Sequence, residues 1–424
     1  MNIKSFFQKF TKNQLIIAGC TIGVILILII FCSIDSANKV KIGFYGISEV
    51  QQTAFKKELK DMKKNSNSAI RIKYKVFDST IPLSSQNTKH CDLILTKSGK
   101  TVTEITSDFS KGKKERVAFD KNLNSGTTVN INNLTNRLES GKLSDVPVLM
   151  DNIEIDLNKE YINKTKTKNI ATLNQLEQFA LKEKNDLPFV FAFNGENPSS
   201  YLDFISICVE SLSGKESLVS AEAIINSTTD GNYDMNSLCA QENSPLYDTV
   251  RMIQAWEKDG VLTSDVYKMS DKTVHALMQN NNVPVVVTTL SDHRTIEANV
   301  ISKYESLPEL SEQRTPYVPS FRSNANRSSV CSAITLVPVS NKRKNKAIAR
   351  YLLSRSTQER LSRSTGLSPV LAQCKTPDIQ ADDARYWISA VSTASLSLAD
   401  SAFASDAERS AFITQLKDYI LATK

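Results

Sequence analysis

Histidine and paired cysteines are scarce in this chain, and that scarcity limits the chemistry it can perform. The three histidines, His90, His275 and His293, lie far apart and form no metal-binding motif. None of the cysteines belongs to a Cys-x-x-Cys pair, so neither a zinc site nor a dithiol redox centre is indicated. The sequence also lacks a Ser-His-Asp motif, a phosphate-binding loop and a Rossmann glycine fingerprint. We therefore predict no enzyme activity, no metal and no cofactor.

Five cysteines follow the N-terminal apolar run, and an odd number cannot complete a disulfide framework. They are Cys91, Cys208, Cys239, Cys331 and Cys374. We expect most of them to be small, buried hydrophobic side chains. The sequence leaves open a single bridge, such as Cys208–Cys239.

The charge balance is mild and does not indicate nucleic-acid binding. The formal net charge is +7, and Lys4, Lys9 and Lys12 contribute three of these charges near the N-terminus. No aromatic RNP motif or Gly-rich basic segment accompanies them. With 41% hydrophobic and 23% charged residues, the chain is typical of a globular protein. It is long enough to form two cores.

One long apolar run lies near the N-terminus. Residues 15–34, LIIAGCTIGVILILIIFCSI, contain no charged side chain, and a helix of this length spans about 30 Å, the thickness of a bilayer core. Lysines precede the run and Asp35 follows it, so the positive-inside rule places residues 1–14 in the cytoplasm. We predict an uncleaved signal anchor, a single transmembrane helix in the cytoplasmic (inner) membrane, with the large domain on the extracytoplasmic (periplasmic) side.

The segment IAGC at 17–20 offers a second interpretation of the same run. It resembles a bacterial lipobox with Cys20 as the lipid acceptor. In a processed lipoprotein, however, the long apolar stretch precedes the cysteine, whereas here it follows Cys20. The signal anchor is therefore favoured, and both interpretations tether the outer domain to a membrane.

The outer domain begins with the pattern of a βαβ unit. Residues 38–46 predict a strand, and residues 48–65 predict a helix whose start Ser48 can cap. Residues 69–78 alternate apolar and basic side chains, and 91–99 form a mostly apolar run, so both predict strands. The apolar residues that we expect to face inward in the second strand are Ile70, Ile72, Tyr74 and Val76. This order predicts a mostly parallel sheet.

The middle of the chain alternates helices with buried strands. Residues 145–162 predict a long extended segment with few breakers. Residues 187–205 predict a buried strand, a loop and a helix. Helical patterns cover 173–185 and 244–265, and 272–294 predicts a helix followed by a buried strand.

The most patterned stretch is TLVPVSNKRKNKAIARYLLSRSTQERLSRSTGLSPV at 335–370. It predicts a buried strand, a basic amphipathic helix and a second, shorter helix. We expect Ser356 and Glu359 to form a capping box at the start of the second helix. Gly366 is expected to end that helix in the left-handed conformation, and Pro369 to block its continuation.

Three segments together resemble one protein family. VPVLMDNIEIDLNKEYINK, from Val146, resembles the first inter-lobe crossover of the bacterial extracellular solute-binding proteins of family 1, the maltodextrin-binding type. MIQAWEKDGVLTSD, from Met252, resembles a helix of that family ending in Asp-Gly-Val, and residues 340–370 resemble its Ser-Asn-Lys helix pair and Thr-Gly-x-x-Pro-Val ending. These proteins are the ligand-capturing subunits of ABC importers. The resemblance covers about 40–395.

The resemblance implies an α/β, periplasmic-binding-protein-like fold, with two α/β lobes, a central cleft and a hinge, here preceded by the N-terminal transmembrane helix. Lobe 1 would comprise 40–147 plus 333–369, and lobe 2 would comprise 152–330 plus 370–424. The Pro-Val ending would lead the chain from one lobe to the other. Such lobes close on a ligand because it contacts both of them.

Candidate ligand contacts lie at the carboxyl ends of strands, where open α/β sheets bind ligands. Those at strand ends are Tyr45, Ser48, Thr96, Ser98, Thr289, Asp292 and Arg294. The resemblance adds a carboxylate, Asp151, in the crossover, and Glu196 and Tyr201 in a later loop. It also places Tyr386 and Trp387 near a sugar-stacking tryptophan. The alternatives are solvated loop charges for Asp151 and Glu196, and core packing for Trp387.

The chain departs from the family at two aromatic positions. Maltodextrin binders carry tryptophans where this chain has Thr96 and Thr289–Leu290. Aromatic rings supply apolar contact with sugar faces, so their absence disfavours a long oligosaccharide. It favours a small polar solute, or a ligand recognised by Arg294 and Arg322. We expect Trp256 to be a core residue.

The sequence thus predicts a membrane-tethered binding protein that captures a small polar solute, carbohydrate first, and delivers it to the permease subunits of an ABC importer. The alternative is an ectodomain that keeps this fold for a structural or signalling role without transport. A glycoside hydrolase using Asp151 and Glu196 as paired carboxylates is a third reading. Its motif support is weakest, and no nucleic-acid partner is predicted.

Overall fold

The computed structural model describes most of the chain beyond the N-terminal segment. The described residues are 21, 39–65, 70–107, 109, 111–124, 129, 131, 134, 135, 137–167, 170, 172–228, 231–307, 328–390 and 393–423. The predicted transmembrane segment, 15–34, lies outside the described residues apart from Thr21. Among the helices that are described, none has the length and apolar character needed to cross a bilayer.

The strands form one continuous, mixed sheet. They are β1 (Lys39–Phe44), β2 (Arg71–Val76), β3 (Leu93–Lys97), β4 (Val146–Asn158), β5 (Phe191–Ala192), β6 (Val285–Thr289), β7 (Tyr304–Leu307), β8 (Ser328–Pro338), β9 (Ser368–Pro369) and β10 (Thr393–Leu396). The main path is β2-β1-β3-β8-β4-β6-β5, with β10 on β8 and with β7 and β9 on β4. β1 pairs in parallel with β2 and β3, so the predicted βαβ start is confirmed.

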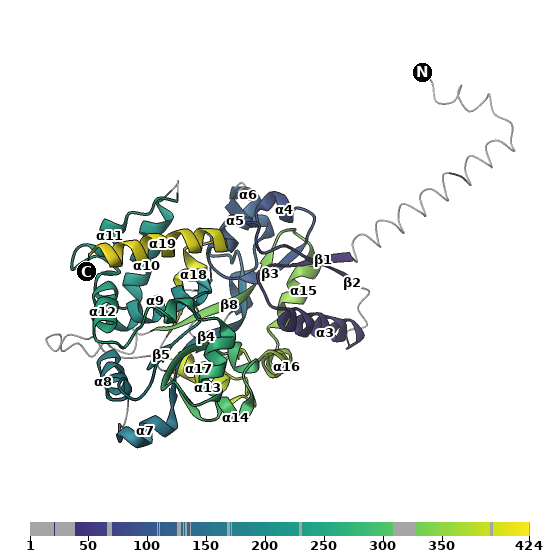
Figure 1. Ribbon diagram of the computed structural model, residues 1–424. Helices are drawn as coiled ribbons and strands as arrows, with labels where there is room; N and C mark the ends of the chain where they lie inside the picture. The colour runs from purple at the N-terminus through teal and green to yellow at the C-terminus, as the bar shows by residue number, and fades with distance from the viewer. Residues whose placement is uncertain are drawn as a thin grey trace, which may run out of the picture.

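Helices cover the sheet along its length (Figure 1). They are α3 (Glu49–Asn65), α4 (Ser85–Thr88), α5 (Lys100–Ser107), α6 (Lys111–Val117), α7 (Lys159–Thr165), α8 (Leu173–Glu183), α9 (Pro198–Ser213), α10 (Lys215–Asn226), α11 (Met235–Cys239), α12 (Tyr247–Lys258), α13 (Asp271–Gln279), α14 (Ala298–Ile301), α15 (Arg343–Leu352), α16 (Arg355–Thr365), α17 (Ile379–Ala390), α18 (Leu398–Ser401) and α19 (Asp406–Ala422), with short 3-10 turns η1 (Lys121–Asn124), η3 (Val266–Lys268) and η4 (Asp292–Arg294). The helices predicted at 48–65, 173–185 and 244–265 correspond to α3, α8 and α12.

Two long strands connect the halves of the sheet. The first half of β4 pairs with β8, and its second half, from Ile153, pairs with β6 and β7. Thirteen residues of β4 extend over roughly 43 Å at 3.3 Å per residue. One strand is therefore long enough to belong to both halves. Figure 1 shows β4 and β8 running between the β1–β3 group and the helices α9–α12.

The buried side chains form two principal cores, one on each half of the sheet. The first core gathers β1, β3, α3, α15 and α16 around Phe44, Phe55, Leu95, Ile348 and Leu361. The second core gathers β5, β6, α9, α12 and α19 around Phe191, Phe204, Trp256, Val286 and Phe412. Trp256 is 1% exposed, which confirms its prediction as a core residue.

The cores bear on the predicted lobe boundaries, which remain predictions. Ala381 and Ala384 of α17 pack in the first core, whereas Leu398 of α18 packs in the second. The chain therefore changes cores near β10. This favours assigning about 370–394 to lobe 1 rather than to lobe 2.

The prediction that β2 turns four apolar residues inward is wrong for its second half. Ile70 is buried, but Tyr74 is 37% and Val76 is 55% exposed. β2 is the edge strand of the sheet, where side chains are less fully covered. Tyr74 instead stacks on Phe44, with 5.7 Å between ring centroids.

The predicted capping box is displaced. α16 begins at Arg355 with Ser354 as its N-cap, so Ser356 lies inside the first turn. Glu359 accepts a hydrogen bond from Arg355 Nε at 2.9 Å and pairs with that side chain instead. Gly366, at φ 77°, ends the helix in the left-handed conformation as predicted.

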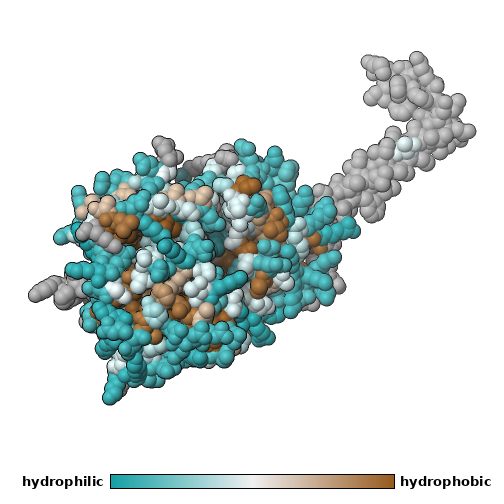
Figure 2. All heavy atoms as spheres, viewed as in Figure 1, coloured by the Kyte–Doolittle hydropathy of each residue, from teal (hydrophilic) through white to brown (hydrophobic). Residues whose placement is uncertain are grey.

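Most of the face shown in Figure 2 is hydrophilic, with hydrophobic atoms in smaller patches.

The cysteines at 91, 208, 239, 331 and 374 are all buried and free. Burial of most of them is thus confirmed, and the Cys208–Cys239 bridge left open by the sequence is not formed.

Candidate functional site

A cavity of about 400 Å³ opens between segments that belong to the two different cores. Tyr45, Phe77 and Thr96 line it from the β1–β3 side, and Ser199 and Arg409 line it from the side of α9 and α19. We call it the cleft cavity. Its volume lies within the range of roughly 300–1,000 Å³ usual for small-molecule sites.

Strand register brings polar side chains to the sheet face at this cavity. In β3 and β8, Lys97 pairs with Ile334, and two residues earlier in β8, Ser332 pairs with Asp151 of β4. Because side chains alternate along a strand, Lys97, Ser332 and Asp151 lie on the same face. On this face of the sheet, the apolar side chains of the first core thus give way to the polar side chains of Lys97, Ser332 and Asp151.

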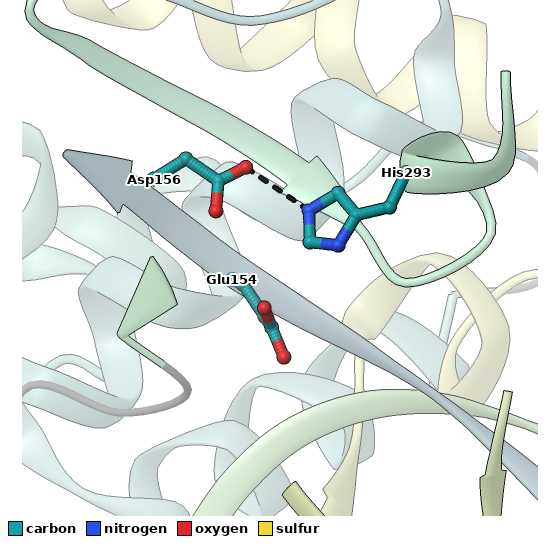
Figure 3. Close-up of side chains that lie close together, drawn as sticks. All are labelled: Glu154, Asp156 and His293. Carbon is teal, nitrogen blue, oxygen red and sulfur yellow. Dashed lines mark hydrogen bonds and ion pairs between the residues drawn. The ribbon is translucent and has the colours of Figure 1, made fainter. Parts of the chain in front are cut away.

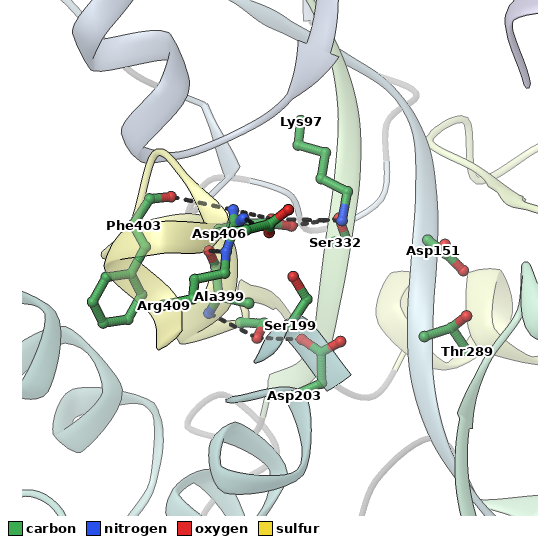
Figure 4. Close-up of polar contacts among 12 residues, drawn as sticks. Lys97, Asp151, Ser199, Asp203, Thr289, Ser332, Ala399, Phe403, Asp406 and Arg409 are labelled. Carbon is green, nitrogen blue, oxygen red and sulfur yellow. Dashed lines mark hydrogen bonds and ion pairs between the residues drawn. The ribbon is translucent and has the colours of Figure 1, made fainter. Parts of the chain in front are cut away.

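Asp400 of α18 is the buried acceptor that connects the two sides. It is 3% exposed and accepts a hydrogen bond from the Ser332 hydroxyl. Lys97 Nζ lies 3.7 Å and Arg409 NH2 3.8 Å from Asp400 Oδ1. The Asp400 carboxylate raises the pKa of Lys97. Figure 4 shows Lys97 reaching toward Ser332, with Arg409 on the helical side.

Arg409 is held in place by neighbours that leave part of its guanidinium near the cavity. Its Nε donates to the Ala399 carbonyl at 2.8 Å and its NH1 donates to Asp406 at 2.7 Å. The side chain is 11% exposed. A guanidinium fixed in this way presents a pre-oriented donor, so less side-chain entropy is lost on binding.

Asp203 lies in the second turn of α9, a helix whose capped N-terminus adjoins the cavity. Asn197 caps it by accepting a hydrogen bond from the Ser199 backbone N–H at 2.9 Å, and Pro198 occupies the first turn. The Ser397 hydroxyl donates to Asp203 at 2.5 Å. Burial raises the pKa of Asp203 to about 7, despite this hydrogen bond and the charge of Lys97.

Asp151 occupies the crossover position that the resemblance implied, and a turn after β6 holds it. The backbone N–H and the hydroxyl of Ser291 donate to its two oxygens at 2.9 and 2.6 Å. Burial raises the pKa of Asp151 to about 6. Thr289 and Asp292 shape the same turn, since the Thr289 N–H donates to Asp292 at 3.0 Å. Asp151 and Thr289 lie on adjacent strands in Figure 4.

Two hydroxyls predicted as ligand contacts are buried near the end of β3. Thr96 and Ser98 are 0% and 1% exposed, and within the described part of the chain neither side-chain oxygen has a hydrogen-bond partner. Thr96 lines the cleft cavity. Buried polar groups are normally satisfied, so the Thr96 hydroxyl is available to a polar ligand or to water.

Tyr45 also reaches both sides of the cavity. It is 4% exposed, and its hydroxyl lies 3.1 Å from the Ile81 carbonyl and 3.4 Å from the Ala404 carbonyl. Together with Phe77 it supplies aromatic surface at positions other than those where the family carries tryptophan. The cleft cavity therefore combines carboxylate acceptors, cationic donors and ring faces, which is the set that recognises hydroxyl-rich molecules.

Several predicted contacts lie away from the cleft cavity. Ser48 accepts a hydrogen bond from the Gln51 backbone N–H at 3.3 Å. It therefore caps α3, which was the second role predicted for it from the sequence. Glu196 is exposed in the loop before α9. Arg294 pairs with Asp378 at 3.1 Å, and it packs against Gly366.

The two aromatic candidates near the C-terminus lie on α17. Tyr386 is 60% exposed, and the side chain of Trp387 lies outside the described part of the structure. Arg322 lies outside it as well. Ligand contact by Trp387 and Arg322 stays a prediction.

Tyr201 does not present its ring to the cleft cavity, which corrects the sequence prediction for this residue. It is 1% exposed in the second core and packs against Phe193 and Tyr267, with ring centroids 5.8 and 5.6 Å away. On α9 it lies two residues before Asp203, and helical periodicity turns the two side chains to different faces. Asp203 faces Ser397 beside the cavity, and Tyr201 faces the core.

Sequence reasoning missed four polar residues of the site. They are Lys97, Asp203, Asp400 and Arg409. Lys97 stands between the two predicted contacts Thr96 and Ser98, so its place at a strand end was a usable signal. The other three lie on helices, where an acidic or basic residue resembles any solvated helical charge.

A separate group of metal-ligand type, Glu154, Asp156 and His293, lies in the second core (Figure 3). None of the three lines the cleft cavity. The sequence analysis predicted no metal site because the three histidines lie far apart, and the acidic partners of His293 are more than a hundred positions away from it in the chain.

Comparison with known proteins finds similarity in structure. The sequence matches no family model and no curated protein. The bacterial solute receptor AcbH, described as having an exclusive preference for β-D-galactopyranose, superposes with a TM-score of 0.66 at 10% identity, covering 90% of this chain and 92% of that one. A chitin oligosaccharide binding protein gives 0.61 at 12% identity, with 91% and 94% covered.

A sugar transporter protein from Bacillus licheniformis, solved with stachyose, gives a TM-score of 0.56 at 11% identity, with 90% and 98% of the chains covered. These neighbours are binding proteins rather than enzymes. The coverage is nearly complete in both directions, so the similarity concerns the whole architecture and not one half of it. The chain therefore has the fold of the bacterial sugar-binding solute receptors, as its crossover, helix and Pro-Val motifs predicted.

Proposed function

We propose that this chain is an extracytoplasmic solute-binding protein, tethered to the membrane, that captures a small polar solute by closing two lobes on it. A carbohydrate is the first class to test, and delivery is to the permease subunits of an ABC importer. The observation that carries the proposal is the cleft cavity, which residues of both cores line. A ligand in that position contacts both sides and so favours the closed state.

The size and chemistry of the cavity support a small solute. Its volume of about 400 Å³ is at the lower end of ligand sites. In its lining, Asp406 offers a carboxylate acceptor, and Lys97 and Arg409 offer donors. Asp151, Asp203 and Asp400 lie close behind Lys97. Tyr45 and Phe77 offer limited ring surface, less than a long oligosaccharide requires.

The proposal includes no catalytic activity. The pair Asp151 and Glu196, considered for glycoside hydrolysis, does not meet in the cleft cavity, because Glu196 is exposed in the loop before α9. Two carboxyls must flank one bond to cleave it. Release of a chromophore from glycosides by the purified protein would contradict this part of the proposal.

The decisive experiment is native mass spectrometry of the freshly purified protein, followed by calorimetric titration with the released compound. Galactose, raffinose, stachyose, chitin oligosaccharides, polyols and oligopeptides form the comparison panel. We expect saturable binding near micromolar, about −8 kcal/mol, with a smaller radius of gyration on binding. Failure of the whole panel, together with crosslinking to a partner that is not a transporter, would instead favour the structural or signalling ectodomain.

The tether is testable in the same preparation. The intact mass of the membrane-extracted protein distinguishes a retained signal anchor from cleavage and lipidation at Cys20. We expect the full-length mass and extraction only by detergent. A mass that begins at Cys20 and carries acyl chains would replace the signal anchor with a lipid anchor.

A further inference from the structure

A buried group of ionisable side chains lies in the second core. Glu154 and Asp156 are two residues apart on β4 and therefore point to the same side of the strand. His293 comes from η4, the turn that follows β6 (Figure 3). One ligand-type atom from each of the three lies within 4.8 Å of the other two. Their exposures are 1%, 0% and 8%.

The closest pair in this group lies slightly nearer than two ligands on one metal ion would. His293 Nε2 is 3.1 Å from Asp156 Oδ2, within hydrogen-bond distance. Nitrogen and oxygen ligands bind zinc at about 2.0–2.2 Å with tetrahedral angles, which places two such atoms roughly 3.3–3.6 Å apart, so a bound ion requires this pair to separate slightly. The Thr288 and Ser306 hydroxyls both donate to Asp156, so the carboxylate is also fixed in orientation, as metal-binding carboxylates are.

Two atoms of the group lack partners. Glu154 Oε2 and His293 Nδ1 have no hydrogen-bond partner among the residues that the structure describes, although both side chains are more than nine-tenths buried. Leaving such atoms unsatisfied destabilises a fold. Their occurrence in one cluster indicates that a polar or charged species belongs between these side chains.

A route and an electrostatic attraction for a cation are both present. Glu154 lines a cavity of about 540 Å³, distinct from the cleft cavity. Glu305, Asp378 and Asp383 line it as well. Among the described residues of this lining, Lys159 is the basic one, and its Nζ donates to the Ser302 carbonyl at 2.9 Å. Acidic side chains therefore predominate along the path to Glu154, and they raise the local concentration of cations.

We propose that Glu154, Asp156 and His293 bind one divalent transition-metal ion, with zinc the best match to one imidazole and two carboxylates. The ion would connect β4 to the turn 291–294. That turn also carries Ser291, the residue that holds Asp151 at the cleft cavity. This site is independent of the solute and of the proposed function, since none of its ligands lines the cleft cavity.

The test is calorimetric titration of the full-length, chelator-treated protein with Zn²⁺, accompanied by the visible spectrum of the Co²⁺ form. We expect one equivalent to bind, with a spectrum of nitrogen and oxygen ligation and no thiolate charge-transfer band. E154Q and H293Q should each weaken Zn²⁺ binding at least tenfold. H275Q, on α13, is the matched control and should bind as the wild type does.

Circular dichroism checks that each variant is folded. If either variant is unfolded, the proposal is judged from the wild-type protein, by the stoichiometry of Zn²⁺ binding and by the spectrum of the Co²⁺ form. Three results would overturn the proposal. They are the absence of saturable Zn²⁺ binding, a thiolate spectrum that points to the buried cysteines, and binding that survives both E154Q and H293Q. In each case the group is a buried histidine–aspartate pair beside a protonated Glu154.

Discussion

The protonation state of each carboxyl beside the cleft cavity decides what it offers to a ligand. An ionised carboxylate only accepts hydrogen bonds, whereas a protonated one also donates. Burial raises the pKa of Asp151 to about 6 and that of Asp203 to about 7. At neutral pH both carboxyls are therefore closer to protonation than an ordinary solvated aspartate is.

Lys97 is the residue whose removal should affect binding most directly. Its ammonium group lies at the junction of β3, β8 and α18 and is 38% exposed, so a ligand can reach it. We expect K97M to weaken binding of the co-purified solute at least tenfold, about 1.4 kcal/mol, with some loss of thermal stability because the buried Asp400 loses one of its two cationic neighbours. Calorimetry measures the affinity, and K60M, on the exposed side of α3, is the control. Equal affinity of K97M and wild type would remove Lys97 from the site.

Asp203 should make the folded protein less stable as the pH rises. Its pKa is about 7 in the folded state and is ordinarily near 4, so the folded protein holds a proton that the unfolded chain releases. The resulting penalty is absent below pH 4, grows between pH 4 and 7, and is complete above pH 7. Lys97, Asp151 and Asp400 face this carboxyl, and Ser397 donates to it.

We therefore expect D203N to stabilise the protein more at pH 8 than at pH 5, by about 1–2 kcal/mol after allowance for partial exposure. Thermal unfolding of both proteins across this pH range measures the difference. D61N, on α3 and outside the cavity, is the control for the substitution itself. A difference between D203N and wild type that stays constant with pH would mean that the folded-state pKa of Asp203 is not raised.

At the scale of elements, strong periodicity made most helices and strands predictable. α3 and α12 follow from apolar spacing alone, because one face of each helix is buried. β4 was predicted as a long extended segment with few breakers, and nearly all of its residues are buried on both faces. The inward direction of Tyr74 was wrong because the pattern of a strand does not reveal whether it lies at a sheet edge. The capping box at Ser356 was wrong because Ser354, two residues earlier, is an equally good N-cap.

The site was predictable only where it coincides with strand ends. This rule selected Tyr45 and Thr96, which line the cleft cavity, whereas Asp151 came from the resemblance, and ligand contact by all three stays a prediction. Asp400 was not found, because it meets Lys97 across some three hundred residues of chain. That contact exists only because β8 and β4 bring both halves of the sheet together, and a local pattern contains no information about such a meeting.

Gly366 provides a test of the ending of α16. It has φ 77°, and a Cβ atom there would collide with the side chain of Arg294. We expect G366A to lower the free energy of unfolding by about 1–2 kcal/mol, from backbone strain and displacement of Arg294. Chemical denaturation measures it. G231A separates the two causes, since Gly231 has φ 68° but open space around its Cβ position.

The G231A variant should therefore lose only the strain contribution, about 1 kcal/mol. G112A is a further control. Gly112 lies within α6, and its Cβ position meets nothing within 4 Å. Alanine favours a helix there, so we expect no loss. Equal effects at 366 and 231 would show that contact with Arg294 contributes nothing.

A buried carboxylate joins α3 to α16. The Glu58 side chain is 3% exposed, and Arg360 NH2 lies 2.8 Å from its Oε2. The Tyr351 hydroxyl also approaches that oxygen, at 3.4 Å. Because Arg360 is 41% exposed, the pair is only partly shielded. Removing Arg360 nevertheless leaves a buried charge without its main partner.

We expect R360M to destabilise the protein by about 2 kcal/mol, and the double variant E58Q/R360M to recover part of that loss because no charge is left buried. Urea denaturation of the two single variants and the double variant gives the coupling energy. Additive effects would mean that Glu58 is well solvated without Arg360.

At the scale of the whole molecule, the two halves touch directly as well as through β4 and β8. Lys100 Nζ on α5 donates to Asn226 Oδ1 on α10 at 2.8 Å. The Tyr45 hydroxyl and the Ala404 carbonyl are 3.4 Å apart, and Lys97 faces Asp400. These contacts hold the two halves together in the structure. In the proposed function, each of them would contribute to the balance between open and closed forms.

Lys100 can test that balance, because it joins the halves without lining the cleft cavity. A partly exposed hydrogen bond of this kind contributes about 0.5–1 kcal/mol, which changes the ratio of closed to open forms by roughly two- to five-fold. We expect K100M to increase the radius of gyration of the ligand-free protein and to weaken solute binding by that factor. X-ray scattering and calorimetry measure the two effects.

N226A should reproduce the effect of K100M, and the double variant should be no worse than either, because all three lack the same hydrogen bond. K60M should change neither quantity. A ligand that contacts both halves compensates for the lost bond, so all liganded forms should scatter alike. If K100M weakened binding with no change in the scattering of the ligand-free protein, Lys100 would act on the ligand rather than on closure. The affinity for the solute would then not depend on an equilibrium between open and closed arrangements of the two halves.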